Sequence, residues 1–459
     1  MKTNRKWLQL FAVLLSFSLL AAACSSEDDT DEGTEEGTEE GGEEAAGSDD
    51  PVVVCELAYY TGEFAAFGPQ LTADVQFPID EVINQDPPLG REWTLVSEDL
   101  GSEGEPQAAR ACLDNNDADI IVSIAHGYRT YRDSMIEHWA ENDGPIVPSV
   151  HGGAIPGNLG GSAEEPIFRA QGLDEGLGTT GVLYADSIGA ETAVIFATEQ
   201  EGFLLAAEAT AAVAETVGLE VVGEITAESG AASYRVQVEQ IAELDPDIVF
   251  LQVTNVEAGT IIKQASEAGL SLNWIGETGL AQEEFINTLG EGVIETQQGV
   301  GYAAFAANQD TAAWEFFSEA WNSTAGYGDV FGDANDAYHF SAYDVMVHTA
   351  LAVEAAGSLN ASAWAPAMHE VGSAPGTMCY TYAECLELIR AGEDVDYEGV
   401  TGSADYTDGG VNSTTAAYTP FNADGSEGEA VILDAARQLE IVEGIAAQAE
   451  CDDNNVCTW

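Results

Sequence analysis

The chain has 459 residues, and its 81 Asp and Glu residues against only 12 Lys and Arg give a formal net charge of −69. Such a charge excludes nucleic acid and anionic membrane surfaces as electrostatic partners. It is expected of a protein that stays soluble in high salt, where screening weakens self-repulsion. The charge therefore indicates a saline habitat rather than a particular ligand.

The first 50 residues are expected to lie outside the fold. Basic residues precede an apolar run at residues 7–20, and Ala21-Ala22-Ala23-Cys24 follows. This pattern is typical of residues 1–24 being a lipoprotein signal peptide, so we predict lipidation of Cys24, with ordinary cleavage or an uncleaved anchor as alternatives. Residues 25–50 consist almost entirely of acidic and small residues. They cannot bury a core and are predicted to form a disordered acidic tether.

Six cysteines remain after Cys24, an even number in an exported chain, which favours disulfides over metal or thiol chemistry. Two pairs are close in sequence, and the third would join the first strand to the second helix. The expected pairs are Cys379 with Cys385, Cys451 with Cys457, and Cys55 with Cys112. This is one of several possible pairings, so the connectivity stays open.

Strands and helices alternate along the remaining ~400 residues, which exceed one comfortable core and so predict two lobes. Residues 52–57 form an unbroken apolar run, typical of a strand buried on both faces, and apolar residues at helical spacing follow from Leu71. Further strands are predicted at 93–98, 120–124, 146–149, 166–169, 193–197, 220–225, 247–251 and 273–275. Further helices are predicted at 106–115, 131–141, 178–188, 203–217, 234–244, 257–268, 311–323 and 334–356. Successive strand–helix units indicate parallel sheets with helices on both faces.

Several segments carry a family pattern in the same order along the chain. The first strand leads to Thr61-Gly62 and Phe67-Gly68, a later strand begins with Asp245-Pro246-Asp247, and a long helix contains Ala342-Tyr343-Asp344. In these features the chain resembles type I periplasmic substrate-binding proteins, the branched-chain amino acid and amide receptors of ABC transporters. The resemblance covers about residues 52–440; the departures are an insertion at 379–385 and the tail.

This resemblance implies an α/β, two-lobe type I periplasmic-binding-protein fold, in which each lobe is a parallel sheet flanked by helices and three hinge crossings join the lobes. Lobe 1 is expected to contain residues 51–173 with 302–410, and lobe 2 residues 174–301 with 411–450. Residues 451–459 would form a C-terminal tail.

Candidate ligand-binding residues lie in the loops that follow strands, because open α/β sheets bind ligands beyond the carboxyl ends of their strands. The lobe 1 candidates are Phe64, His126, Gly127, Tyr128, Ser149, Val150, His151 and Tyr338. The lobe 2 candidates are Phe203, Thr254, Glu277 and Thr278. The resemblance implies that Glu277 or Thr278 meets the ligand ammonium. The alternatives are an ordinary surface glutamate and, for both histidines, hydrogen-bonded loop residues.

The sequence contains no Gly-x-Ser-x-Gly, P-loop or His-Glu-x-x-His motif, so no enzyme activity, metal or cofactor is predicted. The resemblance implies an exported monomer, lipid-anchored to the outer face of the cell membrane or periplasmic. It would capture a small polar solute, an amino acid or amide, and deliver it to the permease subunits of an ABC importer. The alternatives are a sensor subunit of the same fold or, less favoured, an enzyme that uses the cleft.

Overall fold

The computed structural model describes residues 50–61, 65, 68–123, 128–150, 159–171, 174–412 and 415–433, together with residues 437 and 441. The predicted signal, the lipidation of Cys24, the acidic tether and the pair Cys451 and Cys457 lie outside the described residues. Within these ranges, no helix is both long enough and apolar enough to cross a bilayer.

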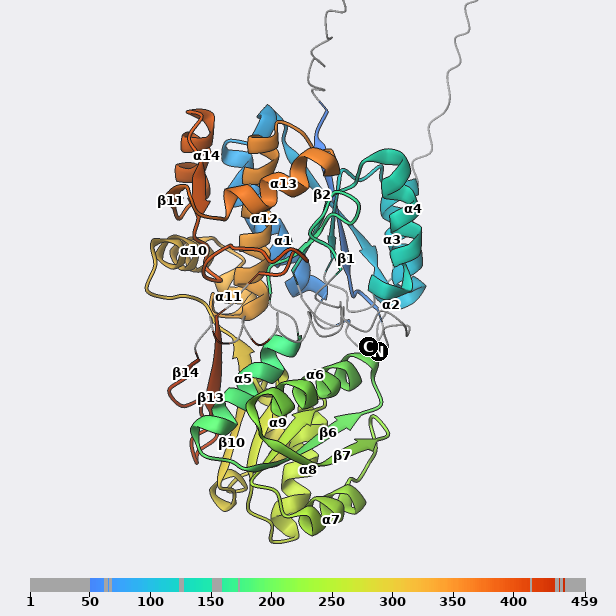
Figure 1. Cartoon of the computed structure of the whole chain (residues 1–459), viewed down its shortest axis with the longest axis vertical. Helices are drawn as coiled ribbons and strands as arrows, with labels where there is room; N and C mark the ends of the chain where they lie inside the picture. Colours follow the sequence, from blue (N-terminus) through green and yellow to red (C-terminus); the bar gives the residue numbers. More distant parts are fainter. Residues whose placement is uncertain are drawn as a thin grey trace, which may run out of the picture. The chain divides into compact units, whose positions relative to one another are not determined.

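A five-stranded parallel sheet forms the centre of lobe 1 (Figure 1). Its order is β2-β1-β3-β4-β5, and the strands are β1 (Val52–Ala58), β2 (Trp93–Asp99), β3 (Ile120–Ser123), β4 (Val147–Ser149) and β5 (Ile167–Arg169). Successive side chains of a strand point to opposite faces. Val54 of β1 therefore packs with α1 (Gly68–Glu81) and α12 (Ala337–Ala356), whereas Cys55 packs with α3 (Glu105–Asp114) and α4 (Arg132–Asn142).

A seven-stranded sheet forms the centre of lobe 2, with the order β14-β13-β10-β9-β8-β6-β7. Its strands are β6 (Thr192–Thr198), β7 (Glu220–Ala227), β8 (Ile248–Gln252), β9 (Asn273–Gly276), β10 (Gly299–Phe305), β13 (Ala416–Pro420) and β14 (Val431–Ile432). The strands from β6 to β10 are parallel, and β13 joins antiparallel to β10. One face packs on α5 (Asp174–Ser187) and α6 (Glu201–Val217). The other packs on α7 (Arg235–Leu244), α8 (Asn255–Glu267) and α9 (Glu283–Leu289).

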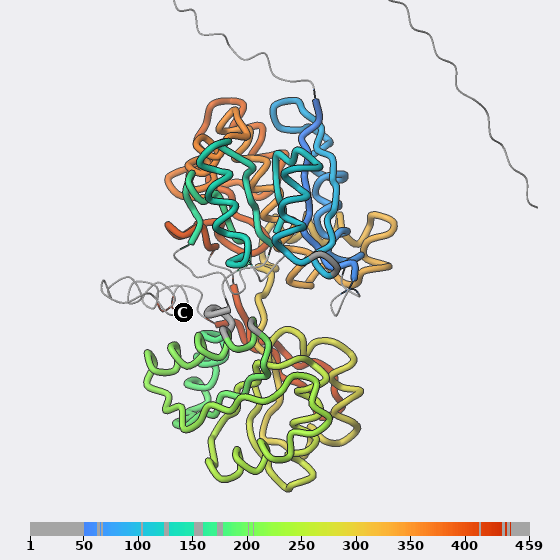
Figure 2. Tube along the Cα trace, turned by 90° about the vertical axis from the view of Figure 1, so that its right-hand side faces the viewer, coloured from blue at the N-terminus to red at the C-terminus, as the bar shows by residue number. Residues whose placement is uncertain are grey.

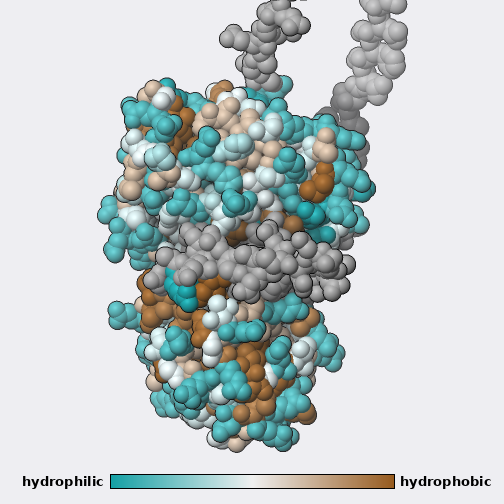
Figure 3. Space-filling view, viewed as in Figure 1, coloured by the Kyte–Doolittle hydropathy of each residue, from teal (hydrophilic) through white to brown (hydrophobic). Residues whose placement is uncertain are grey.

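Several later elements extend lobe 1, and Figure 2 shows these orange segments in the same lobe as the blue N-terminal ones. They are α10 (Ala312–Ser323), α11 (Gly328–Phe331), α13 (Ala361–Val371), α14 (Tyr382–Arg390) and the parallel pair β11 (Thr377–Cys379) and β12 (Val395–Tyr397). The short helices are α2 (Leu100–Glu103), η1 (Ile83–Gln85), η2 (Pro88–Gly90), η3 (Tyr128–Thr130), η4 (Thr278–Ala281) and η5 (Ile294–Thr296). Hydrophilic residues cover much of the described surface in Figure 3, as the net charge requires.

The chain passes between the two sheets three times: after β5, after β10 and before β13. These passages are hydrogen-bonded to one another. The amide of Arg169 donates to the Gly410 carbonyl at 2.8 Å, and the Ala306 amide donates to the Thr415 carbonyl at 2.8 Å. The buried Arg169 guanidinium also donates to the carbonyls of Leu159 and Gly409, each at 2.6 Å. The predicted fold class, with its two lobes and three crossings, is confirmed.

Some elements differ from the prediction or were not foreseen. The second sheet continues to Phe305 in β10, beyond the expected start of the return to lobe 1 at residue 302. No strand was predicted for β13, which is only five residues long and ends in Pro420. No helix was predicted for α13 either, because Pro366 lies inside it and interrupts the helical pattern.

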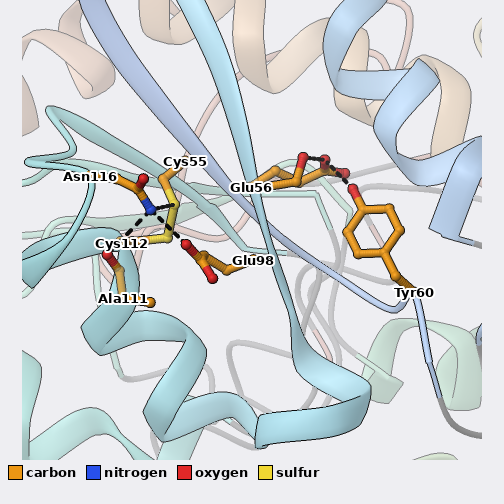
Figure 4. Close-up of a disulfide and its surroundings, with 8 residues drawn as sticks. Cys55, Glu56, Tyr60, Glu98, Ala111, Cys112 and Asn116 are labelled. Atoms are coloured by element: carbon orange, nitrogen blue, oxygen red, sulfur yellow. Dashed lines mark hydrogen bonds between the residues drawn. A yellow bond between two sulfur atoms is a disulfide. The ribbon is translucent and has the colours of Figure 1, made fainter. Parts of the chain in front are cut away.

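Two of the expected disulfides form within the described residues. Cys55 of β1 is bonded to Cys112 of α3, with a Cα–Cα distance of 5.7 Å. Cys379 of β11 is bonded to Cys385 of α14, with a Cα–Cα distance of 5.5 Å. The first closes a large loop across one face of the lobe 1 sheet (Figure 4), and the second fixes the short insertion.

Candidate ligand-binding site

In lobe 2, polar side chains follow the ends of adjacent parallel strands. Glu277 comes directly after β9, Thr254 follows β8, and α6 with Phe203 follows β6. The order β9-β8-β6 makes these strands neighbours, so their carboxyl ends meet at one edge of the sheet. In an open α/β sheet this edge is where ligands bind.

Glu277 carries a buried acceptor with no donor. The residue is half-buried in extended backbone, and its Oε1 is fully buried yet accepts no hydrogen bond from the described residues. Burial disfavours the charged form of a carboxyl group, and it raises the pKa of Glu277 to about 7. A carboxylate in this position is costly unless donors reach it.

Gln252 stands beside Glu277 on the neighbouring strand. Phe250 of β8 pairs with Ile275 of β9; Gln252 lies two positions further along β8, and Glu277, in extended backbone directly after β9, lies two positions beyond Ile275. Both side chains therefore emerge on the same face. The Nε2 of Gln252 donates to Thr210 Oγ1 of α6 at 3.2 Å, while its buried Oε1 also accepts no hydrogen bond from the described residues. The edge thus presents two acceptor oxygens to which no described residue donates.

Gln252 was not among the candidates from the sequence. The only signal was a polar residue at the end of the otherwise apolar run of residues 248–251. Its value depends on the strand register, which places it next to Glu277.

Glu257, on α8 at the same edge, shows the opposite situation. Burial raises the pKa of this carboxyl group, but hydrogen bonds outweigh it and the net pKa is lowered. Its oxygens accept from Thr198, Ser229, Gly230, Tyr234 and Thr254. Glu257 therefore ties together the loops that follow β6, β7 and β8, a role that sequence reasoning missed. Among the described residues of this edge, several groups therefore donate hydrogen bonds to Glu257, whereas none donates to Oε1 of Glu277.

Thr254 has a structural task in this network. It is the N-cap of α8 and forms a capping box with Glu257, in which the Glu257 amide donates to Thr254 Oγ1 at 3.3 Å. The other lobe 2 candidates keep partly exposed side chains. Phe203 lies in the first turn of α6, and Thr278 begins η4.

In lobe 1, the described candidates contribute to the loops themselves. The buried Tyr128 hydroxyl donates to Glu165 Oε1 at 2.5 Å, and Arg132 binds both oxygens of the same carboxylate at 2.7 and 2.8 Å. The Ser149 hydroxyl donates to the Ser123 carbonyl at 3.1 Å, and the side chain of Val150 is buried in the core. These side chains position the edge of lobe 1.

Tyr338, the remaining lobe 1 candidate, is half-buried in the first turn of α12, and its amide donates to the capping Asp336 at 2.8 Å. Phe64, His126, Gly127 and His151 lie outside the described residues. Among the residues that are described, no three His, Cys, Asp or Glu side chains are arranged to hold a metal ion.

Comparison with known proteins identifies the architecture around this edge. A family model described as periplasmic binding protein matches residues 51–383. A leucine-binding protein from Thermotoga maritima has a similar fold, with a TM-score of 0.65 at 17% sequence identity, covering 84% of this chain and 99% of that one. No curated protein is significantly similar in sequence.

Two further solved structures show the same fold. A branched-chain amino acid transporter substrate-binding protein from Streptococcus pneumoniae, in complex with isoleucine, has a TM-score of 0.62 at 16% identity, over 83% of this chain and 99% of that one. A solute-binding protein of an ABC transporter from R. palustris, in complex with benzoate, has a TM-score of 0.58 at 16% identity, over 83% and 95%.

Proposed function

Because the chain belongs to the periplasmic binding protein family, we propose that it is the exported solute receptor of an ABC importer and that its ligand carries an ammonium or amide N–H group, as an amino acid does. The observation that supports this ligand class is the pair of donor-less oxygens on Gln252 and Glu277 at the lobe 2 edge.

A ligand ammonium would satisfy both oxygens at once. It carries up to about three N–H donors and a positive charge, which would return Glu277 to its ionised form. A charge-assisted bond of this kind contributes ~1.5 to 3 kcal/mol, enough to select an amine over an uncharged analogue. A ligand that offers only a carboxylate to this edge would face an amide oxygen and, once Glu277 is ionised, a second carboxylate, and both would repel it.

The ligands of the structural neighbours do not decide the question. Those proteins include a leucine-binding protein, a complex with benzoate and a fatty acid receptor, all at 16 or 17% identity. Such identities carry the fold alone, because sites are grafted onto folds. Glu277 and Gln252 are therefore the better guide to the solute of this chain.

The proposed mechanism is a shift between open and closed populations. The ligand contacts both lobes only when they close around the three crossings, and the permease reads the closed form. Lipid attachment at Cys24 and the acidic tether would keep this monomeric receptor at the outer face of the membrane.

A thermal-shift screen of the mature protein in molar salt tests the proposal. The panel contains amino acids, amides, urea, polyamines and short-chain acids, and a ligand at ~100 times its dissociation constant adds about 2.7 kcal/mol to stability. We expect one amine- or amide-bearing class to raise the melting temperature. Glu277→Gln should reduce that shift to about half or less, whereas Glu284→Gln, at an exposed position of α9, should retain it.

Other results of this screen contradict parts of the proposal. Shifts only with acids that lack an N–H group would keep the receptor and remove Glu277 from the contact. No shift with any member would favour the sensor subunit or the enzyme. Chemical conversion of a panel member during incubation would identify the enzyme.

A further inference from the structure

A glutamate is buried in the middle of the first strand of lobe 1. Glu56 has 0% of its surface exposed, and it lies on the face of β1 that packs against α1 and α12, between the core residues Val54 and Ala58. Figure 4 shows it on the opposite side of β1 from the Cys55–Cys112 disulfide. An acid among apolar residues of a central strand needs an explanation, because burial of an unpaired charge is costly.

The carboxyl group begins a chain of polar contacts that ends on α1. Glu56 Oε2 lies 3.2 Å from the Tyr60 hydroxyl, and Ser97 Oγ donates to the same oxygen at 3.0 Å. The Tyr60 hydroxyl also makes a short hydrogen bond with Thr72 Oγ1. Thr72 in turn donates to the carbonyl of Gly68, the first residue of α1, at 3.0 Å. These contacts connect the strand, the loop that follows the strand and the start of the helix.

The number of hydrogens available to this series of polar contacts shows which group carries a proton. The contacts Glu56–Tyr60, Tyr60–Thr72 and Thr72–Gly68 each need one hydrogen between their two oxygens. The two hydroxyl groups carry one hydrogen each, and the Gly68 carbonyl carries none. All three bonds can therefore exist together only if Glu56 is protonated and donates to Tyr60. If Glu56 is ionised, one of the three contacts has no hydrogen, and the lone pairs of its two oxygens face each other.

We infer that Glu56 is a proton-linked positioning residue, which as a neutral carboxylic acid holds Tyr60 against the start of α1 at the ligand-binding edge of lobe 1. The inference rests on the proposed function in one respect: it takes this edge to be the one that meets the solute. Tyr60 is the second residue after β1, and its backbone amide donates to Asp99 at the end of β2 at 2.9 Å, so its place along this edge is fixed from two sides.

The surroundings of Glu56 favour the neutral acid. Its Oε1 accepts no hydrogen bond from the described residues, and burial raises the pKa of Glu56 to about 7 against the opposing hydrogen bonds from Ser97, Tyr60 and Thr72. Asp74 on α1 adds to the increase through its charge.

The described elements packed against Glu56 place no compensating positive charge beside it. The β1 neighbours in register are Ser97 on β2 and Val122 on β3, neither of which is charged. From α12, His339 is already bonded to Asp74 at 2.5 Å, and Asp336 adds further negative charge near Asp74. Among the described groups, no cation faces Glu56 directly. Ionisation is expected as the pH rises through about 7, and the contact to α1 weakens in that direction.

Hydrogen exchange of the ligand-free protein tests this inference, with rates corrected for the intrinsic effect of pH. The peptide covering residues 59–72 is compared at about pH 6 and about pH 8.5, on either side of the transition. We expect protection of this peptide in the wild type to fall about fivefold, the equilibrium equivalent of one hydrogen bond. A peptide covering β6 in lobe 2 is the internal reference and should not change.

Two variants separate a proton switch from a merely structural role. Glu56→Gln keeps an N–H donor toward Tyr60 at every pH, so it should stay protected at both values. Glu56→Val removes the donor and should be poorly protected at both. A wild-type peptide with the same protection at both pH values would overturn the inference, as would an equal loss in Glu56→Gln, because Asp74 and His339 titrate in both proteins.

Binding gives the second readout. With L-leucine as the probe, the ratio of the wild-type dissociation constant to that of Glu56→Gln should rise about fivefold between the same two pH values, because ionisation of Glu277 affects both proteins equally. If neither L-leucine nor any other amine or amide binds, the proposed function fails while the exchange experiment still decides the role of Glu56. A ratio of the two dissociation constants that does not change with pH, together with the expected exchange pattern, would contradict the link between Tyr60 and the solute.

Discussion

Replacing Glu277 by glutamine should make the ligand-free protein more stable while it weakens the binding of an amine. No described residue donates to the buried Oε1 of Glu277, and burial raises the pKa of the group from 4.5 to about 7. Each pKa unit corresponds to about 1.4 kcal/mol, so a rise from 4.5 to about 7 means that the ionised acid costs at most about 3.5 kcal/mol. The residue is half-buried, and water reduces this cost, so we expect Glu277→Gln to gain about 2 kcal/mol at pH 8.

The dependence on pH follows from the direction of the pKa change. A carboxyl group whose pKa is raised by folding favours the folded state most below the unfolded value of 4.5, and this advantage is lost as the pH rises to about 7. The gain of Glu277→Gln should therefore be small at about pH 4.5 and constant above about pH 7. For an amine ligand, the same change should weaken binding by about 10- to 100-fold, the loss of one charge-assisted bond.

Denaturant unfolding in molar salt at both pH values measures the stability change, and titration calorimetry at pH 8 measures the affinity. Glu284→Gln is the matched control, since it removes an exposed acid from the next helix and should change stability by less than about 0.5 kcal/mol. A Glu277→Gln protein that is less stable than the wild type at pH 8 would refute the reasoning. It would mean that the carboxylate has a stabilising partner in the free protein.

Three further changes should destabilise the protein, each measured by thermal and denaturant unfolding. Glu257→Ala leaves the donors of three loops without this acceptor and should lower the free energy of unfolding by about 3 kcal/mol. Because folding lowers the pKa of Glu257, acidification of the wild type through that pKa should remove part of the same stability. Asp344→Ala should also lower the free energy of unfolding by about 3 kcal/mol, since the carboxylate accepts hydrogen bonds from the Val400 and Thr401 amides at 3.0 and 2.6 Å. A melting temperature equal to that of the wild type would show that water replaces the carboxylate as the acceptor. Replacing Cys55 and Cys112 together by alanine opens a loop with a sequence separation of 57 and should cost about 2 to 5 kcal/mol, and reduction of the wild type should give the same loss.

Much of the fold follows from patterns that are local in the sequence. Apolar runs such as residues 248–251 form buried central strands, and the polar or turn-forming residues that flank each run mark where the strand begins and ends. The long helix α12 was predicted, and it is buried along nearly its whole length, as its apolar composition favours. The elements that escaped prediction are those in which tertiary contacts decide, such as β13, whose partner β10 lies more than a hundred residues earlier.

The candidate site could be predicted only in part, because its chemistry depends on which polar groups meet. The position of Glu277 after β9 was expected, but the missing donors of Glu277 and the neighbouring Gln252 appear only when β8 and β9 are in register. Tyr128 was a candidate ligand contact, yet its hydroxyl is bonded to Glu165, 37 residues away in sequence. His126 and His151 stay predictions.

The hydrogen bonds between the three crossings have a mechanical consequence. Backbones that are joined side by side, as Arg169 is to Gly410 and Ala306 is to Thr415, bend together as a ribbon. A ribbon flexes readily out of its plane and resists shear within it. We therefore expect the lobes to move about a single axis, so that strain applied to one connection is shared by all three. The distance between two probes, one on each lobe on either side of this axis, would therefore report the fraction of the protein that has bound ligand.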